Sequence, residues 1–263
     1  MSPVSVFAAN NIALITGGAS GIGLAVAQLC RKHAMKVAIA DNNAEYLAKA
    51  KETLNGGSDV ETYQLDVSKI EQWKDLKGKV QQKFGPVDFL RRQIFDTNFF
   101  GVVHGLNTFV PEIQAQKKPS AIVVTGSKQG ITNPPGNVAY NASKSAIKTL
   151  AEHLSYDLKD TKTSVHLLVP GWTFTGLSGG HPGSEQEKPA GAWAPSQVAD
   201  YLYKKMEQGK FYAICPDNDV TEEIDKKRML WTQGDIVYER QPVSRWRDEY
   251  KDEAAKWMEE QKL

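Results

Sequence analysis

Two side chains in the middle of the sequence are spaced to move a proton. Tyr140 and Lys144 stand four residues apart, and Ser127 lies thirteen residues before the tyrosine. Residues four apart lie on the same side of a helix, so the ammonium of Lys144 would lie beside the phenol of Tyr140 and favour its ionised form. A tyrosine in that setting can exchange protons near neutral pH. Taken alone, this spacing more often belongs to one core and one surface residue.

A glycine-rich turn near the start of the chain has the features of a phosphate-binding loop. Gly17, Gly21 and Gly23 follow an apolar run at 12–15 and open a helical stretch at 24–33. Without side chains the backbone can approach a pyrophosphate, and the helix N-terminus offers free N–H groups and partial positive charge. The strand and helix on its two sides favour a dinucleotide site over a plain glycine turn.

An acidic residue ends the second apolar run, as a dinucleotide site requires. Asp41 comes eighteen residues after Gly23, where its carboxylate can accept hydrogen bonds from the adenosine ribose hydroxyls. A carboxylate there would repel a 2'-phosphate, and Asn42 and Asn43 follow in place of a basic residue, so NAD is favoured over NADP. The alternative is that Asp41 only caps the helix that begins near Asn43.

Alternating apolar and amphipathic stretches predict the elements that position these residues. We expect strands near 11–16, 36–40, 61–65, 87–90, 121–125, 164–169 and 211–215. We expect helices near 21–33, 43–54, 69–84, 92–114, 139–160 and 195–208. Right-handed crossovers then give an α/β fold, a doubly wound, mostly parallel seven-stranded sheet with helices on both faces, Rossmann-like.

The chain length fits one domain over residues 1–263, with two unusual segments. Residues 173–195 are rich in Gly, Ser, Pro and Glu and too long for an ordinary connection, which makes them a candidate substrate lid. Residues 219–263 form a charged C-terminal extension. Trp231, Trp246 and Trp257 occur at intervals along it, so we expect surface helices that wrap either the core or a partner subunit.

The glycine turn, followed by Ser127 and the Tyr140-Lys144 pair, resembles the short-chain dehydrogenase/reductase family over about residues 11–175. The resemblance implies that Ser127 polarises a substrate carbonyl, Tyr140 transfers the proton, and Lys144 holds the nicotinamide ribose and tunes the tyrosine. Hydride transfer changes the charge on the substrate oxygen, so a poised proton donor must compensate. Asn98 matches the family asparagine that kinks its helix and holds a water linked to the lysine.

The same resemblance implies a set of cofactor-binding residues. They are Gly17, Ser20, Gly21, Ile22, Gly23, Asp41, Asp66, Val67, Tyr140, Lys144, Pro170, Gly171, Thr173 and Thr175. Ser20 stands where NADP-preferring relatives often carry a basic residue, which again favours NAD. Asp66 is nearly as well explained as an ordinary helix cap. Trp172 and Phe174 are candidates for the cofactor or substrate wall, or for the core of the lid.

The sequence departs from the family pattern after the fourth strand. Leu90 is followed at once by Arg91, where the family continues into an Asn-Asn-Ala-Gly segment, and about twenty expected residues are absent. Three accounts compete: a real deletion in an impaired or repurposed protein, a disordered loop skipped in the numbering, or removal by a faulty gene prediction or a cloning step. We favour the skipped loop because both flanks match an active enzyme.

Net charge, cysteine and histidine spacing and the lack of long apolar runs argue against several classes of protein. The net charge of +1 gives no global field to hold nucleic acid or an acidic membrane. Cys30 and Cys215 lack ligand or disulfide spacing, the histidines are dispersed, and we expect no metal site. No targeting segment or long apolar run is evident, so we expect a cytoplasmic protein.

The leading hypothesis is an NAD-dependent dehydrogenase or reductase that interconverts a secondary alcohol and a ketone. By resemblance, it forms a homodimer or homotetramer through the helices near 92–114 and 139–160. A non-catalytic nucleotide-binding or scaffold protein that lost activity with the missing segment is the alternative. An epimerase or dehydratase is weaker, because such relatives usually carry a larger C-terminal substrate domain.

Overall fold

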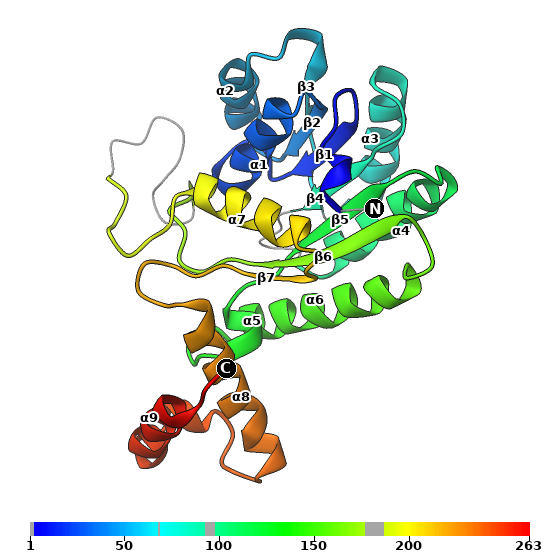
Figure 1. Cartoon of the computed structure of the whole chain (residues 1–263). Coiled ribbons are helices and arrows are strands. Elements are labelled where there is room, and N and C mark those ends of the chain that lie inside the picture. Colours follow the sequence, from blue (N-terminus) through cyan, green and yellow to red (C-terminus); the bar gives the residue numbers. More distant parts are fainter. Residues whose placement is uncertain (1–2, 68, 93–97, 177–186) are drawn as a thin grey trace.

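The computed structural model describes residues 3–67, 69–92, 98–176 and 187–263, and its centre is one parallel sheet (Figure 1). The strands are β1 (Ile12–Thr16), β2 (Lys36–Asp41), β3 (Val60–Gln64), β4 (Phe89–Arg92), β5 (Ser120–Thr125), β6 (Thr163–Val169) and β7 (Tyr212–Ile214). Their order is β3-β2-β1-β4-β5-β6-β7, and every neighbouring pair is parallel. The predicted doubly wound fold is confirmed.

Helices cover both faces of the sheet, which explains why the central strands are continuously apolar. The helices are α1 (Gly21–Lys32), α2 (Ala44–Leu54), α3 (Ile70–Lys83), α4 (Phe100–Ala115), α5 (Gln129–Thr132), α6 (Val138–Asp157), α7 (Pro195–Glu207), α8 (Glu222–Val237) and α9 (Lys251–Glu260), with 3-10 turns η1 (Pro3–Val6), η2 (Gly57–Asp59), η4 (Ser244–Trp246) and η5 (Asp248–Tyr250). One core joins the sheet to α1, α2 and α7, and the other joins it to α3, α4 and α6.

Burial of large side chains anchors these layers. All five residues of β1 are buried, and Trp73 of α3 packs edge-on to Phe109 of α4 with ring centroids 6.1 Å apart. Each fully buried side chain of this size stabilises the fold by about 2–3 kcal/mol through removal of apolar surface from water. The sheet is therefore a tightly packed base for the segments that follow its strands.

The structure corrects the sequence prediction at the fourth strand. β4 extends to Arg92, and α4 begins at Phe100 rather than at residue 92; residues 93–97 lie outside the described part of the chain. Leu90 and Arg91 take consecutive register positions against both β1 and β5. Strand β4 therefore runs without interruption through Leu90 and Arg91, and the cause of the missing segment stays a prediction.

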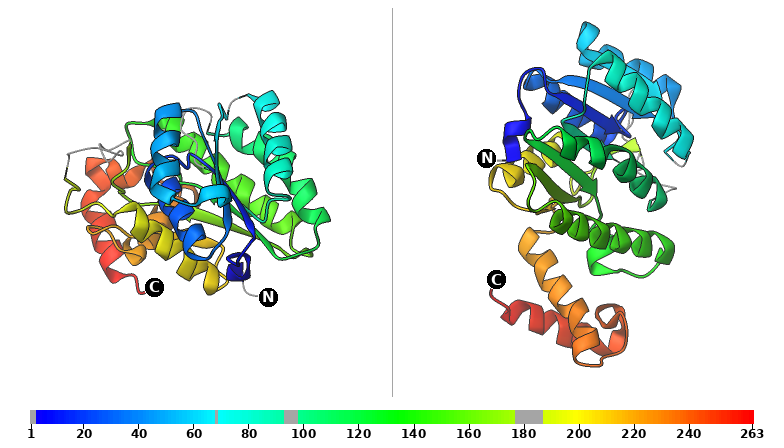
Figure 2. Two further views of the ribbon diagram at one scale, coloured as in Figure 1. Left: turned by 90° about the horizontal axis from the view of Figure 1, so that it is seen from above. Right: turned by 90° about the vertical axis from the view of Figure 1, so that its right-hand side faces the viewer.

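The C-terminal extension forms surface helices, and two of its tryptophans anchor them. α8 and α9 project from the body beyond α5 and α6 (Figures 1 and 2). Trp231 is buried and packs against Trp257 with ring centroids 5.5 Å apart, while Trp246 is exposed. The indole N–H of Trp231 donates to Ser244 Oγ at 2.8 Å, which ties η4 to α8. Over the residues that the structure describes, none of these helices is long and apolar enough to cross a membrane.

Candidate active site

A cavity of about 380 Å³ lies at the carboxyl ends of the central strands and gathers residues from distant parts of the chain. Of the predicted site residues, those that line it are Ile22, Ser127, Tyr140, Lys144, Pro170, Gly171, Thr173 and Thr175. They come from α1, from the segment after β5, from α6 and from the segment after β6. The cavity therefore joins the glycine-turn helix to the predicted proton-transfer residues.

Helix α6 positions Tyr140 and Lys144 one turn apart on the side that faces this cavity. The Asn137 side chain caps the helix by accepting the backbone N–H of Tyr140 at 3.4 Å. Lys144 is 5% exposed, its Nζ donates to the Thr125 carbonyl at 3.0 Å, and the same Nζ lies 5.8 Å from the centroid of the Tyr140 ring. The cation thus lies beside the phenol, as the spacing predicts.

Ser127 is held at the end of β5 by backbone interactions. Its Oγ accepts the N–H of Gln129 at 3.2 Å, while the N–H of Gly126 donates to the Leu168 carbonyl of β6 at 2.7 Å. A Cβ at Gly130 would lie 2.6 Å from the Lys144 carbonyl carbon, so only glycine lets α5 approach α6 this closely. The serine hydroxyl is therefore fixed against the lysine-bearing helix.

Asn98 reaches the same helix from outside the cavity. Its Nδ2 donates to Ser143 Oγ at 2.9 Å, and Ser143 in turn donates to the Tyr140 carbonyl at 2.7 Å. Asn98 Oδ1 is buried and accepts no hydrogen bond from the described residues. Asn98 is in a turn before α4 and not inside a helix, so the predicted helix kink is not at this residue.

The glycine turn has the backbone conformation that the sequence predicts. Gly17 and Gly21 have φ of 60° and 51°, which side-chain-bearing residues rarely adopt. A Cβ at Gly21 would lie 3.0 Å from the Thr175 side chain, so the turn after β6 closes against the glycine turn. Ser20 is the N-cap of α1 without capping it by its side chain, and Ile22 and Gly23 are buried in the first turn.

Asp41 links β2 to the glycine turn. Its carboxylate accepts the N–H of Ala19 at 3.3 Å and the N–H of Asn43 at 3.1 Å. Asn43 caps α2, because its side chain accepts the N–H of Tyr46 at 3.0 Å. The alternative that Asp41 is only a helix cap therefore loses its main support.

Asp66 and Val67 lie beyond β3, outside the catalytic cavity. The N–H of Asp66 donates to Gln72 Oε1 at 2.7 Å, and the Val67 carbonyl accepts the indole N–H of Trp73 at 3.0 Å. Asp66 lines a separate cavity of about 650 Å³ with Asn42. The pair thus follows the carboxyl end of β3, the edge strand on the opposite side of the sheet from β7, and its contact with adenine stays a prediction.

The two described ends of the candidate lid are tied to each other. Thr173 bridges Trp193 in parallel register, and the N–H of Trp193 donates to the Trp172 carbonyl at 2.9 Å. Trp172 lines the cavity and is 48% exposed, whereas Phe174 is half-buried beside it. Residues 177–186 lie outside the described residues, and the role of 173–195 as a lid stays a prediction.

Sequence reasoning missed Lys128, which follows Ser127 and also lines the cavity. Its ammonium pairs with Asp217 at 3.1 Å and with Asp225 at 2.7 Å. Both carboxylates come from about ninety residues further along the chain, so no local pattern could signal this cluster. The one sequence signal for Lys128 is that it directly follows Ser127.

The cysteines and His166 are structural. Cys30 and Cys215 are free and buried, and burial raises the pKa of Cys215 to about 12. His166 is buried on β6, and its ring hydrogen-bonds to the Lys210 carbonyl at 2.8 Å and to Ser164 Oγ at 3.0 Å. His181, another of the dispersed histidines, lies outside the described residues.

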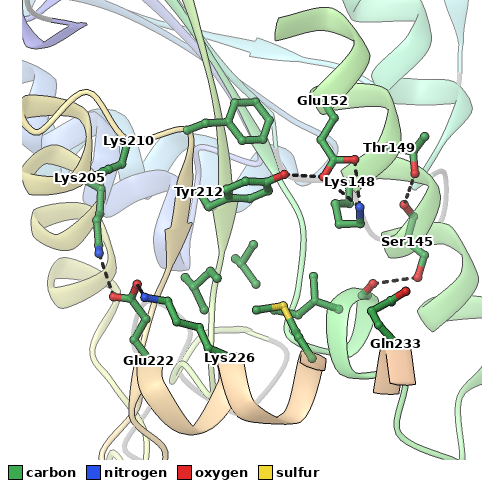
Figure 3. Close-up of a pocket in the computed structure, with 16 residues that line it drawn as sticks. Ser145, Lys148, Thr149, Glu152, Lys205, Lys210, Tyr212, Glu222, Lys226 and Gln233 are labelled. Carbon is green, nitrogen blue, oxygen red and sulfur yellow. Dashed lines mark hydrogen bonds and ion pairs between the residues drawn. The ribbon is translucent and has the colours of Figure 1, made fainter. Parts of the chain in front are cut away.

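A larger cavity of about 710 Å³ lies between α6, β7 and α8 (Figure 3). Both of its carboxylates have partners: Glu152 accepts the Tyr212 hydroxyl at 2.6 Å, and Glu222 pairs with Lys205 at 2.8 Å. No predicted site residue lines it. Because these groups satisfy each other and do not converge on one reacting atom, we assign the chemistry to the smaller cavity.

Known proteins resemble the chain over most of its length. It is 27% identical over 196 residues to an NADP-dependent (R)-specific alcohol dehydrogenase of Lentilactobacillus kefiri, covering 66% of this chain and 78% of that protein. It is 28% identical over 236 residues to a 3-dehydrosphinganine reductase of Arabidopsis thaliana, covering 76% and 68%. A short-chain dehydrogenase/reductase of Burkholderia phymatum, solved in complex with NAD, superposes with a TM-score of 0.77 at 26% identity, covering 90% of this chain and 97% of that one.

The sequence model of a family described as short chain dehydrogenase matches residues 11–93 and 91–182. The two matched segments meet at the position where the sequence departs from the family pattern. Together they span the glycine turn, the cavity residues after β5 and β6, and helix α6. The chain belongs to the short-chain dehydrogenase family.

Proposed function

We propose that this chain is an NAD-dependent oxidoreductase that interconverts a secondary alcohol and a ketone in the 380 Å³ cavity. One observation carries the proposal: Ser127, Tyr140 and Lys144 line the same cavity as Ile22 of the glycine-turn helix. A site where a dinucleotide and a substrate react side by side needs both proton-transfer groups and a phosphate-binding helix end.

The residues present fit a nicotinamide dinucleotide. The positive φ of Gly17 and Gly21 leaves backbone exposed at the start of α1, where N–H groups and the helix dipole favour a pyrophosphate. Asp41 would accept the adenosine ribose hydroxyls, and Pro170 and Gly171 would pack against the nicotinamide end. When bound, the nicotinamide supplies or accepts the hydride.

The side chains around the cavity would transfer a proton to or from the substrate oxygen. In the reducing direction the Tyr140 hydroxyl gives its proton to the substrate oxygen as negative charge develops there, and in the oxidising direction the phenolate takes it back. The Lys144 ammonium, 5.8 Å from the ring centroid, stabilises that phenolate. Ser127 donates a hydrogen bond to the same substrate oxygen, which stabilises the charge in the transition state.

Asn98 would support the site from outside the cavity, through its contact with α6. It is bonded to Ser143, the residue before Lys144, at 2.9 Å, and its buried Oδ1 has no partner among the described residues. That oxygen is therefore suited to accept a hydrogen bond from a water, which would link the lysine to solvent and return protons to Tyr140.

Asp41 supports NAD over NADP as the cofactor. Its carboxylate accepts two backbone N–H groups at 3.3 Å and 3.1 Å, an arrangement that keeps the negative charge beside the ribose position. A 2'-phosphate there would meet like charge. Relatives differ on this point, since one is an NADP-dependent dehydrogenase and another was solved with NAD.

Exposed apolar side chains on α4 and α6 support the proposal that the chain forms an oligomer. Phe100 at the start of α4 and Val138 at the start of α6 are exposed, on the helices that relatives are expected to pair. A homodimer or homotetramer in the cytoplasm is the expected state. Sedimentation velocity checks it, and a monomer at all concentrations would contradict it.

A second candidate function is dinucleotide binding without turnover. The family match divides at residues 91–93, where the expected segment after β4 is missing from the sequence. Loss of that segment would remove contacts on the adenosine side. Binding of NAD with no turnover across a broad panel of alcohols and ketones would select this candidate.

The test is steady-state turnover of such a panel, followed by the absorbance of reduced nicotinamide, for wild type and for Tyr140→Phe. Loss of the general acid–base group lowers kcat by about 100-fold or more while NAD still binds. Tyr156→Phe is the matched control, because Tyr156 is on the same helix but is 68% exposed and outside the cavity. Full turnover by Tyr140→Phe would refute the assignment.

A further inference from the structure

Lys128 connects the catalytic segment to the C-terminal helix. It follows Ser127, lines the cavity, and its side chain is 14% exposed. Its Nζ lies 3.1 Å from Asp217 Oδ2, in the loop after β7, and 2.7 Å from Asp225 Oδ2, in the first turn of α8. The Lys128 ammonium is thus paired with carboxylates from the loop after β7 and from α8. Neither of these segments contains a predicted site residue.

One of these carboxylates, Asp217, also holds the segment after β6. Asp217 Oδ2 accepts the N–H of Trp172 at 3.2 Å, and Asp217 Oδ1 accepts the N–H of Val220 at 2.8 Å. A Cβ at Gly171 would lie 2.7 Å from Asp217 Oδ2 and 2.9 Å from Lys128 Nζ. One ion-pair cluster therefore joins three parts of the chain. They are segment 170–172 on the nicotinamide side, the Ser127–Lys128 segment after β5 (the serine segment), and the start of α8.

The charges explain why the lysine is held in place. Burial acts to raise the pKa of Asp217, but the hydrogen bond and charge of Lys128 outweigh it and lower that pKa below its ordinary value. Asp225 is fully buried, and desolvation raises its pKa despite Lys128. Arg228 lies 3.5 Å from Asp225 as a second cation. Both carboxylates thus hold the Lys128 ammonium in place at the cavity wall.

We propose that Lys128 is a positioning residue of the active site, and that α8, through Asp225, holds the nicotinamide end of the cavity in place. This inference rests on the proposed function for the identity of the ligand. Its consequence is specific: loss of the cluster disturbs the Gly171–Trp172 side of the site and leaves the glycine turn at the adenosine side intact.

The test compares two ligands that share the adenosine diphosphate part. Dissociation constants of NADH and of ADP-ribose, which lacks nicotinamide, are measured by calorimetry for wild type, Lys128→Met, Asp225→Asn and the double variant. Lys128→Met removes the cation paired with Asp217 and leaves Asp225 with Arg228 at 3.5 Å, so NADH binding weakens about 10-fold, while ADP-ribose binding changes less than about twofold.

The double variant adds a test of coupling. Asp225→Asn weakens NADH binding in wild type, because it removes one partner of Lys128. In the Lys128→Met background the same change strengthens NADH binding, because it removes one of the two carboxylates that have lost the Lys128 cation. If Lys128→Met does not fold, the dissociation constants of NADH and ADP-ribose can still be compared between wild type and Asp225→Asn.

Lys148→Met is the control, since its 2.9 Å pair with Glu152 on α6 lies outside this cavity, and it leaves both dissociation constants unchanged. Equal weakening of NADH and ADP-ribose, no weakening of either, or strictly additive effects of the two substitutions would each overturn the inference. The assay needs no turnover. A wild type that binds NADH but reduces no ketone would end the proposed function and leave this result standing.

Discussion

At the scale of single residues, the chemistry that depends on local spacing is visible in the sequence and the chemistry that depends on distant partners is not. Tyr140 and Lys144 share one helical turn, so their contact follows from their spacing. Lys128 meets Asp217 and Asp225 only because β7 returns beside β6 and α8 begins there. Nothing in the sequence near Ser127 encodes that meeting.

Asp41 gives a prediction at this scale. Asp41→Asn keeps a side-chain oxygen for the N–H groups of Ala19 and Asn43 but removes the charge. The ratio of kcat/KM for NAD over that for NADP falls by about 10-fold, because the repulsion of a 2'-phosphate is lost. Steady-state kinetics with both cofactors measures it. Asp59→Asn, a comparable loss of charge on η2, leaves the ratio as in wild type, and an unchanged ratio in Asp41→Asn would show that this carboxylate does not choose the cofactor.

At the scale of elements, periodicity located every strand of the sheet and most helices to within a few residues. β1 and β5 are buried along their whole length, which is why unbroken apolar runs marked them. The start of α4 was misplaced because the sequence after Leu90 lacks the family segment, so no pattern separated strand from helix there. The short helix α5 was also missed, because four residues carry no periodic signal.

The Glu222 carboxylate of α8 pairs with Lys205 of α7, and this pair predicts that the stability of the fold depends on pH. Burial acts to raise the pKa of Glu222, but hydrogen bonds from Lys205, Tyr201 and Lys226 outweigh it and lower that pKa from 4.5 to about 2. Since the folded-state pKa is depressed, this stabilisation is complete above pH 4.5 and is lost as the pH falls from 4.5 towards 2.

Glu222→Gln therefore lowers the free energy of unfolding by about 2 kcal/mol at neutral pH, and the difference from wild type shrinks through that acid window. Thermal or urea unfolding at a series of pH values measures it. Glu223→Gln is the control, because Glu223 is the neighbouring carboxylate on α8 and its side chain is 55% exposed. A difference that stayed constant down to pH 2 would exclude the ion-pair explanation.

At the scale of the whole molecule, the strand order places the glycine turn, the serine segment and the segment after β6 at one edge of the sheet. That convergence was predictable, because a doubly wound sheet brings the carboxyl ends of its strands together. The position of α8 was not predictable, because its ion pairs with the rest of the fold are made by Lys128 and Glu222 and not by a repeated pattern.

The most direct measurement follows an isotope from cofactor to product. NADH deuterated at its hydride-donating carbon is incubated with the enzyme and a ketone panel, and the alcohols are analysed by mass spectrometry. Wild type and Tyr156→Phe place deuterium on the carbinol carbon, whereas Tyr140→Phe binds NADH and places almost none. Alcohol products without deuterium, or equal transfer by Tyr140→Phe, would contradict the claim that this cavity exchanges hydride with Tyr140 as its proton donor.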